Sequence, residues 1–245
     1  MDFRPELALA ESAAREAGRM LAGRIERRVL SSEGHDVKLE LDRISEELIK
    51  AALAHGTNLP ILGEESGLSA ALEPNRLFWI VDPLDGSLNF SRGIPLCCVS
   101  IALWSGNAPV LGVVYDFNRD EMVSGLRSHG VYLNGAPVLR PEGRNAADSI
   151  LATGFPSYLL HNEQTLQRVI RDIRRYKKIR LLGSAALSLA YVALGRVNAY
   201  FEDSIKLWDV AAGLAICSEF GFATELIELD PSQYLYRVRV DNVLV

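Results

Sequence analysis

Five short apolar segments lie in the first half of the chain, and turn residues separate most of them. They occupy residues 59–62, 77–81, 97–104, 109–116 and 121–126. Segments of this length, rich in aliphatic residues and bounded by Gly, Pro, Asn or Asp, are typical of β-strands. Because no helical pattern lies between the last four, neighbouring strands can pair through short turns in an antiparallel or mixed sheet. Asn134-Gly135, within residues 130–138, predicts a further hairpin.

Helical periodicity lies on both sides of these segments in the sequence. It predicts helices at residues 5–29, 41–55, 161–176 and 184–194. We expect a loop or short hairpin at residues 31–41 and a strand at residues 150–153. The character of the chain changes near residues 140–148. We therefore predict an α+β fold, with a mixed sheet in an N-terminal subdomain (residues 1–143) and an α/β pattern in a C-terminal subdomain (residues 144–245).

Composition excludes several classes of protein. The chain has 245 residues, 49% of them hydrophobic, and a formal net charge of −5 with basic residues dispersed outside residues 171–180. This balance makes no electrostatic case for nucleic acid or a membrane surface as a partner, and each apolar run is shorter than the roughly 18 residues of a membrane span. The N-terminus is acidic where a signal peptide would be basic. We therefore expect a cytoplasmic protein with three reduced, packed cysteines, Cys97, Cys98 and Cys217.

Two aspartates follow the predicted strand at residues 77–81. Asp82 and Asp85 are separated by Pro83 and a leucine. Pro83 fixes φ near about −65°, and we expect the turn that it starts to bring both carboxylates to one point. Two carboxylates held that close repel each other unless one is protonated, a basic partner lies nearby, or a cation binds between them. Oxygen ligands without His or Cys are those that Mg²⁺ prefers.

The residues after Asp85 form a second predicted turn. Gly86 and Ser87 would offer backbone N–H groups and a hydroxyl, which can hold a phosphate. The alternative is a capped turn in which the Asp85 carboxylate bonds Ser87 and Asn89 locally.

Further acidic residues lie at comparable places in the predicted elements. Glu64 and Glu65 follow another short strand, and Asp209 lies at the start of a predicted helix. Each has a simpler explanation, because the glutamates can be surface charges and Asp209 can be a helix N-cap. Together with Asp82 and Asp85 they nevertheless form a set of carboxylates at strand ends and at a helix start.

Six motifs in a fixed order give the chain a resemblance to a known family. They are GEES (63–66), WIVDPLDGSLNF (79–90), GVYLNG (130–135), TGFP (153–156), LLGSAALSLAYVALGRVNAYFE (181–202) and WDVAAG (208–213). On these motifs the chain resembles the inositol monophosphatase family of lithium-sensitive, magnesium-dependent sugar and nucleotide phosphatases. The resemblance covers about residues 36–222. It implies a layered α/β/α/β/α sandwich with the active site between the two subdomains.

The resemblance also implies roles for single residues. Two or three Mg²⁺ ions, or Mn²⁺ in their place, would be bound by Glu64, Asp82, the Leu84 carbonyl, Asp85, Asp209 and, at a third and weaker position, Asp42. The catalytic residues would be Glu64, Asp82 and Ser87, with Glu64 and the Ser87 hydroxyl activating the attacking water. Ser87 stands where the family usually has threonine. Contacts to the substrate would come from Asp85, Gly86, Ser87, Ser184, Ala185, Glu202 and Asp209.

The implied activity is hydrolysis of a small phosphate monoester, in the first place inositol monophosphate, by a lithium-sensitive homodimer. Alternative substrates within the superfamily are 3′-phosphoadenosine 5′-phosphate, fructose-1,6-bisphosphate and histidinol phosphate. An alternative of another class is a non-catalytic regulatory binding protein on the same fold. These alternatives stay open at the level of the sequence.

The C-terminal residues 226–245 depart from the family pattern. The family would continue with a further loop, a strand and a terminal helix, whereas this chain ends in IELDPSQYLYRVRVDNVLV. Residues 234–240 alternate apolar side chains with arginine, which predicts an edge strand. Such a strand would close the second sheet differently or pair with another subunit.

Overall fold

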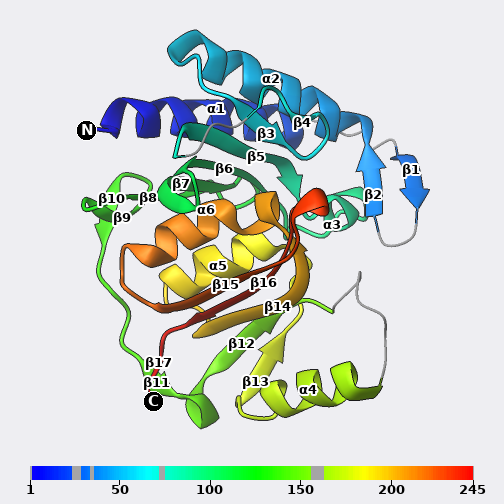
Figure 1. Cartoon of the computed structure of the whole chain (residues 1–245), viewed down its shortest axis with the longest axis vertical. Helices are drawn as coiled ribbons and strands as arrows, with labels where there is room; N and C mark the ends of the chain where they lie inside the picture. Colours follow the sequence, from blue (N-terminus) through cyan, green and yellow to red (C-terminus); the bar gives the residue numbers. More distant parts are fainter. Residues whose placement is uncertain (1, 24–28, 34–35, 72–74, 156–162, 245) are drawn as a thin grey trace.

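The computed structural model describes residues 2–23, 29–33, 36–71, 75–155 and 163–244. Five layers follow one another: two helices, a large sheet, two helices, a smaller sheet and one outer helix (Figure 1). The helices are α1 (Arg4–Ala22), α2 (Glu40–Gly56), α3 (Ser87–Ser91), α4 (Glu163–Ile173), α5 (Ala185–Ala193) and α6 (Leu207–Ser218), with 3-10 turns η1 (Ala146–Asp148) and η2 (Pro231–Gln233). The layered α+β sandwich is therefore confirmed. In the described residues, no helix is long and apolar enough to span a membrane.

The larger sheet has eight strands and supplies one wall of the site. In spatial order they are β10 (Ala136–Val138), β9 (Gly130–Leu133), β8 (Glu121–Leu126), β7 (Ala108–Asp116), β6 (Cys98–Ser105), β5 (Leu77–Asp85), β3 (Ile61–Gly63) and β4 (Gly67–Leu68). Neighbouring strands pair antiparallel except β3 and β5, which run parallel, so the predicted mixed sheet is confirmed. The predicted hairpin joins β9 to β10, with φ of 50° at Asn134 and 79° at Gly135.

Helices α1 and α2 cover the outer face of this sheet. The predicted helix at residues 5–29 is too long, because α1 ends at Ala22. Gly23 follows, a poor helix former whose N–H donates to Arg19 O at 3.1 Å. Residues 24–28 lie outside the described residues, and Val29 already belongs to β1 (Val29–Glu33). Strand β1 pairs with β2 (Asp36–Leu39), so the hairpin is the correct alternative for this segment.

The smaller sheet corrects the interpretation of the C-terminal segment. Its order is β13 (Lys178–Arg180), β12 (Ile150–Thr153), β14 (Ala199–Lys206), β16 (Leu235–Asp241) and β15 (Ala223–Asp230), while β17 (Val243–Leu244) pairs with β11 (Arg144–Asn145). The predicted edge strand is β16, and it lies between β14 and β15. Its arginines are neutralised within the fold, since Arg237 forms an ion pair with Asp203 and Arg239 one with Asp241. The arginine alternation therefore does not mark an exposed edge.

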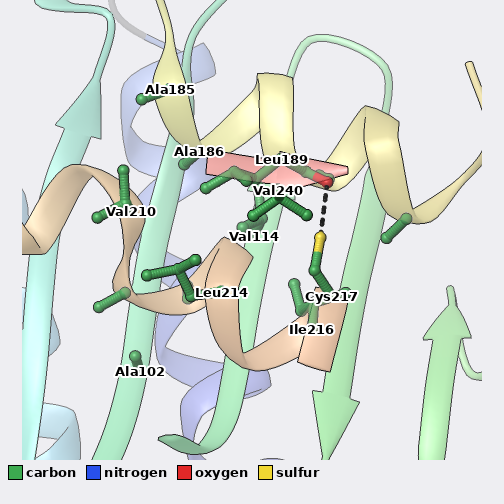
Figure 2. Packing of buried hydrophobic residues seen from close by; sticks show 14 of the residues in the cluster. Ala102, Val114, Ala185, Ala186, Leu189, Val210, Leu214, Ile216, Cys217 and Val240 are labelled. Atoms are coloured by element: carbon green, nitrogen blue, oxygen red, sulfur yellow. Dashed lines mark hydrogen bonds between the residues drawn. The ribbon is translucent and has the colours of Figure 1, made fainter. Parts of the chain in front are cut away.

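Helices α5 and α6 form the layer that both sheets share. Their apolar side chains pack against Ala102 and Val114 of the larger sheet and Val240 of the smaller one (Figure 2). The Cys217 thiol of α6 donates to the carbonyl of Leu189 in α5 at 3.4 Å. The cysteines are free and buried, as predicted: Cys97, Cys98 and Cys217.

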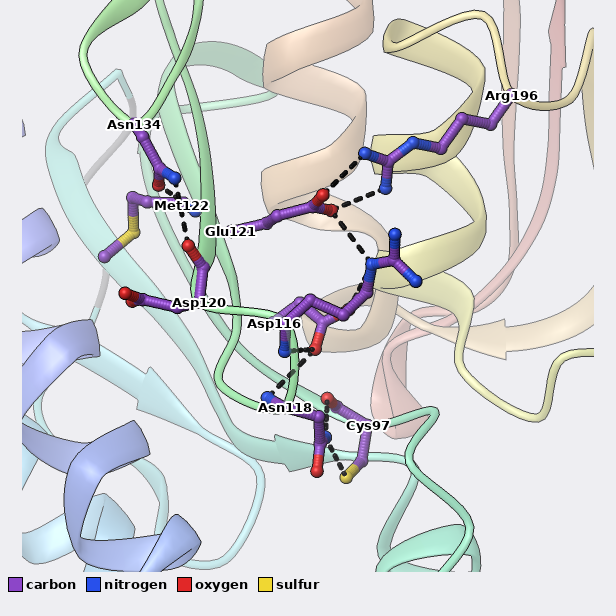
Figure 3. Close-up of polar contacts among 9 residues, drawn as sticks. Cys97, Asp116, Asn118, Asp120, Glu121, Met122, Asn134 and Arg196 are labelled. Carbon is purple, nitrogen blue, oxygen red and sulfur yellow. Dashed lines mark hydrogen bonds and ion pairs between the residues drawn. The ribbon is translucent and has the colours of Figure 1, made fainter.

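An ion pair ties the turn between β7 and β8 to the loop after α5 (Figure 3). The two terminal nitrogens of Arg196 donate to the two carboxylate oxygens of Glu121, at 2.5 and 2.7 Å. Arg119 adds a longer bond of 3.3 Å to the same carboxylate. The hydrogen bond from Arg196 lowers the pKa of the Glu121 carboxyl below its usual value.

We expect Glu121→Gln to lower the free energy of unfolding by about 1 kcal/mol at pH 7, because it removes one charge of a half-buried pair. A carboxyl whose pKa is lowered in the folded state contributes stability above its unfolded pKa, about 4.3. That contribution is lost as the pH falls through the lower folded pKa. Urea unfolding should therefore show a smaller difference from wild type at pH 4 than at pH 7. A difference that did not change with pH would contradict this role, and the exposed Glu142→Gln serves as control.

Candidate active site

A pocket of about 350 Å³ lies where the two sheets meet the N-terminal ends of α3, α5 and α6. Its lining contains Glu64, Asp82, Leu84, Asp85, Gly86, Ser87, Leu88, Thr153, Gly154, Phe155, Gly183, Ser184, Ala185, Ser188, Glu202, Ile205 and Asp209. The structure thus brings together every site residue that the sequence indicated except Asp42. Asp42 is buried in α2, and its Oδ1 lies 3.3 Å from the Ser87 hydroxyl.

The two aspartates that follow residues 77–81 lie inside strand β5 rather than after its end. Strand β5 runs to Asp85, and its register with β6 shifts between Asp82 and Asp85. In a regular strand, residues three apart point to opposite faces of the sheet. The irregularity therefore allows both side chains to face the pocket. The N–H of Leu84 donates to Asp82 Oδ1 at 3.0 Å, which fixes this carboxylate against its own backbone.

Asp85 is held by the first turn of α5. Its Oδ2 accepts the Ser184 hydroxyl at 2.6 Å and the N–H of Ala186 at 2.7 Å. The local alternative, in which Asp85 caps Ser87 and Asn89, is therefore wrong. The Asn89 amide instead donates to the carbonyl oxygens of Leu96 and Leu182, both at 2.8 Å. Asp85 and Asn89 thus fix the segment after β5 to the start of α5.

Gly86 forms the corner between β5 and α3. Its φ is 91°, a left-handed conformation that favours glycine. A Cβ there would lie 2.8 Å from Leu96 O, so any side chain would also collide with backbone. The hydroxyl of Ser87, the next residue, bonds to Leu84 O at 2.9 Å.

Glu64 and Asp209 approach the pocket from two other elements. Glu64 follows β3, and its N–H donates to Val81 O at 3.2 Å. Asp209 is the third residue of α6, not its N-cap, and its Oδ2 accepts the N–H of Lys206 at 3.2 Å. The N-cap interpretation is therefore wrong, although the carboxylate does satisfy one backbone donor near the helix start. Glu65 does not line the pocket.

Glu202 reaches the pocket from β14. Its Oε2 accepts the Tyr200 hydroxyl at 2.8 Å, and the N–H of Gly154 also bonds this carboxylate. A Cβ on Gly154 would lie 2.0 Å from Glu202 Oε1, so glycine is required for this close approach.

Burial raises the pKa of every carboxyl in the pocket, and repulsion from neighbouring carboxylates adds to this at Glu64, Asp82, Glu202 and Asp209. Loss of water raises the pKa of Glu64 to about 8, with repulsion from Asp42 as the next cause. Loss of water is also the first cause at Asp85, whose pKa rises to about 6 against its hydrogen bonds, and at Glu202, whose pKa rises to about 7. The pKa values of Asp82 and Asp209 lie well above the usual range for the same reason, with added repulsion from Glu64. A full set of charges here requires a positive partner.

Among the described residues, the lining of this pocket contains no Lys, Arg, His or Cys. The side chains of Glu64 and Asp82 lie within hydrogen-bonding reach of each other, a contact that two carboxyl groups can make when one of them is protonated. Within the described residues, no group of three or more acidic, His or Cys side chains is arranged so that it could hold a metal ion as it stands. The donor set, four carboxylates on one cavity, nevertheless has the chemistry that a hard divalent cation requires. The residues present therefore fit Mg²⁺ by type, with side-chain rotation needed for the carboxylates to converge.

Several residues of the lining were not predicted from the sequence. Most of them lie within the motifs quoted above, so a signal was present: Thr153, Gly154, Phe155, Gly183 and Ser188. Ile205 had no such signal. It enters the pocket because β14 shifts register between Asp203 and Ile205, where Ser204 adopts φ of 62°. Leu88, a half-exposed residue of the lining, also lies within a quoted motif, WIVDPLDGSLNF (79–90).

Comparison with known proteins identifies the family of this chain. A model of the inositol monophosphatase family matches residues 2–239. Nus factor SuhB from Xylella fastidiosa is 37% identical over 224 residues, which cover 89% of this chain and 80% of that protein. Inositol-1-monophosphatase from Mesorhizobium japonicum is 38% identical over 216 residues, which cover 85% and 80%. The structure of inositol monophosphatase from Anabaena (Nostoc) superposes with a TM-score of 0.84 at 30% identity, covering 99% of this chain and 92% of that one. This chain belongs to the inositol monophosphatase family.

Proposed function

We propose that the chain is a magnesium-dependent phosphatase that hydrolyses a small phosphate monoester, in the first place inositol monophosphate, by direct attack of water. The observation that carries this proposal is one pocket lined by Glu64, Asp82, Asp85 and Asp209, beside the turn at Gly86. Family membership and the relative named inositol-1-monophosphatase support it.

The proposed metal ligands are the carboxylates of Glu64, Asp82, Asp85 and Asp209, the carbonyl of Leu84 and, at a third position, Asp42. Divalent cations held there would neutralise the charge of the phosphoryl group and act as Lewis acids on it. Because a water activated by the cations would itself be the nucleophile, the proposal needs no covalent intermediate on the protein.

The chain's own residues would orient the water and the phosphate. The Ser87 hydroxyl donates a hydrogen bond to Leu84 O or to Asp42 Oδ1, so its oxygen lone pairs remain to accept a hydrogen bond from water. Glu64 would take up the proton that the water loses. The N–H groups of Gly86 and Ser87 would donate to the phosphate oxygens. Serine retains the hydroxyl of the family's threonine, so the chemistry does not depend on the missing methyl group.

The polyol part of the substrate would lie against Glu202, Ser184 and Ala185. Glu202 keeps part of its surface at the pocket, and its carboxylate can accept bonds from hydroxyl groups. An acid at this place repels a second phosphate in a site with little water. We therefore place monophosphates ahead of fructose-1,6-bisphosphate.

A regulatory role is the second candidate, because a relative at 37% identity carries the name Nus factor SuhB. A protein with this role alone would gain nothing from four clustered carboxylates, which raise one another's pKa and cost stability when charged. The pocket therefore favours the phosphatase. We also propose a homodimer in the cytoplasm, with subdomains 1–143 and 144–245 on either side of the site, on the strength of the family resemblance.

Phosphate release from inositol-1-phosphate tests the proposal. We expect turnover that requires Mg²⁺, stops with a chelator and is inhibited by Li⁺. Mg²⁺ should also raise the melting temperature, because a ligand of the native state alone stabilises it by about 2.7 kcal/mol at a concentration 100 times its dissociation constant. Stabilisation without turnover of inositol-1-phosphate, 3′-phosphoadenosine 5′-phosphate, fructose-1,6-bisphosphate or histidinol phosphate would favour the regulatory role. If Mg²⁺ neither supported turnover nor raised the melting temperature, the proposed metal site would be wrong.

A further inference from the structure

One face of α2 carries three buried polar side chains within two turns. Asp42, Ser45 and Glu46 are 2%, 0% and 2% exposed. Residues three and four apart share a face of a helix, so all three point in one direction. Buried polar groups require hydrogen-bond partners, and the partners of this face lie in the segments that build the pocket.

Each of the three side chains contacts a different segment of the pocket wall. Asp42 meets the Ser87 hydroxyl at the start of α3. The Ser45 hydroxyl donates to the carbonyl of Pro83, between the two aspartates of β5, at 2.9 Å. The Glu46 carboxylate contacts the turn that follows β3, which carries Glu64. Helix α2 therefore reaches behind three of the segments that line the pocket.

The contact of Glu46 is the most extensive. Its two oxygens accept the N–H groups of Glu65 at 2.8 Å and Ser66 at 3.1 Å. On the other side of Glu64, a Cβ on Gly63 would lie 2.6 Å from the Glu46 carboxyl, so glycine is needed for the carboxylate to reach the turn. One buried carboxylate thus accepts two hydrogen bonds from the backbone after Glu64 and lies against the backbone before it.

Lys50 completes this contact from the next turn of α2. Its Nζ lies 3.9 Å from Glu46 Oε1 and donates to the Ser66 hydroxyl at 2.8 Å. Two backbone donors and a nearby ammonium satisfy a charge that would otherwise be costly to bury. The Glu46 carboxylate therefore has partners for both oxygens behind the pocket, where it accepts two backbone hydrogen bonds at once.

We propose that Glu46 is a positioning residue, which fixes the backbone of residues 63–66 and thereby aims the Glu64 carboxylate into the pocket. The proposal rests on the proposed function, because Glu64 is a metal ligand and proton acceptor only there. Strand β3 ends at Gly63, and its last backbone hydrogen bond to β5 is the one that the N–H of Glu64 donates. The next two backbone N–H groups, those of Glu65 and Ser66, donate to the Glu46 carboxylate.

Glu46→Gln tests the role with little change of shape. A glutamine amide offers one acceptor oxygen, and its NH₂ group faces the second backbone N–H, so one of the two bonds is lost. Groups behind a metal ligand typically contribute about 10–100-fold to metal affinity or activity. We expect Mn²⁺ binding to the metal-free protein, followed by electron paramagnetic resonance, to weaken at least about 10-fold. Hydrogen exchange at the amides of Glu65 and Ser66 should become faster by a similar factor.

The matched control is Glu47→Gln, the same substitution one residue along the same helix. The Glu47 side chain is 62% exposed and, among the described residues, pairs with Arg43 on the surface, so binding and exchange should match wild type. We expect turnover of Glu46→Gln to fall with little change in KM, because Glu202 and Ser184 still hold the substrate. If Glu46→Gln fails to fold, Lys50→Met provides the milder variant, with a smaller shift in the same direction.

The outcomes separate the two proposals. If the wild-type protein binds Mn²⁺ and the Glu46→Gln protein binds it equally well, the positioning role is wrong and the proposed function is unaffected. Unchanged exchange at residues 65 and 66 would also overturn the positioning role alone. Wild-type protein that binds no Mn²⁺ would overturn the proposed function and the positioning role with it. Mn²⁺ binding without turnover would overturn the phosphatase reaction, while weaker binding by Glu46→Gln would still support the positioning of Glu64.

Discussion

Asp82→Asn is expected to lower the rate of phosphate release by at least about 10²–10³-fold while the fold is retained. The side chain is 1% exposed and touches the backbone N–H of Leu84, a bond that asparagine can still accept. The substitution removes one negative charge from the four that would hold the cation, and loss of one preorganised electrostatic partner costs about this factor in other enzymes. The measurement is turnover of inositol-1-phosphate at saturating Mg²⁺.

The same variant separates loss of chemistry from loss of structure. The pKa of Asp82 is raised first by burial and then by Glu64, Asp85 and Asp209, so its charge opposes folding when no cation is bound. We therefore expect metal-free Asp82→Asn protein to melt at or above the temperature of the wild type, and Mg²⁺ to stabilise it less. Glu225→Gln, on the exposed strand β15, should change neither property. Parental turnover by Asp82→Asn would contradict the metal assignment.

The carboxylates of the site could be predicted because each belongs to a local pattern. Asp82 and Asp85 follow an apolar run, and Asp209 follows a tryptophan at a helix start, so their elements are visible in a short window of sequence. The prediction failed where pairing partners decide the structure. Strand β16 looks like an edge strand because of its arginines, yet Asp203 lies far away in the sequence and neutralises Arg237.

The proposed substrate wall was less predictable than the proposed metal ligands for the same reason. Ile205 lines the pocket because β14 shifts register at Ser204, a backbone irregularity with no residue pattern of its own. Glu46 could not be predicted either, since a glutamate on a helix is usually solvated. Its burial depends on Gly63, whose missing side chain leaves room for the carboxylate. Long-range contacts of this kind require the assembled fold.

Helix α6 shows how the shared layer positions the site. Asp209 lies in its first turn, so the position of the whole helix sets the position of this carboxylate. The helix lies against β7 at Gly112, where a Cβ would be 2.2 Å from the carbonyl oxygen of Ala212. It lies against α5 at Gly213, where a Cβ would be 2.3 Å from the Cβ of Leu189. Two glycines thus let the helix approach the sheet and its neighbouring helix.

We expect Gly112→Ala to lower the free energy of unfolding by about 3 kcal/mol, the upper part of the range for an overpacked core. The added methyl meets backbone atoms of α6, which cannot rotate away as the end of a side chain can. Relief therefore requires α6 to move away from β7 and to take Asp209 with it. A displacement of about 1 Å of a catalytic group can cost about 10²-fold in rate. Urea unfolding and turnover of inositol-1-phosphate measure the two effects.

Gly23→Ala is the matched control, because its added methyl would meet nothing closer than the Arg19 carbonyl oxygen at 3.4 Å and its φ is −78°. A change at such a surface position usually stays within about 0.5 kcal/mol, so stability and turnover should match wild type. Wild-type stability in Gly112→Ala would show that α6 is not held this close to β7. Lower stability with undiminished turnover would show that the helix can move without displacing Asp209. If the shared helical layer positions the site, Gly112→Ala must lower both stability and turnover, and Gly23→Ala must change neither.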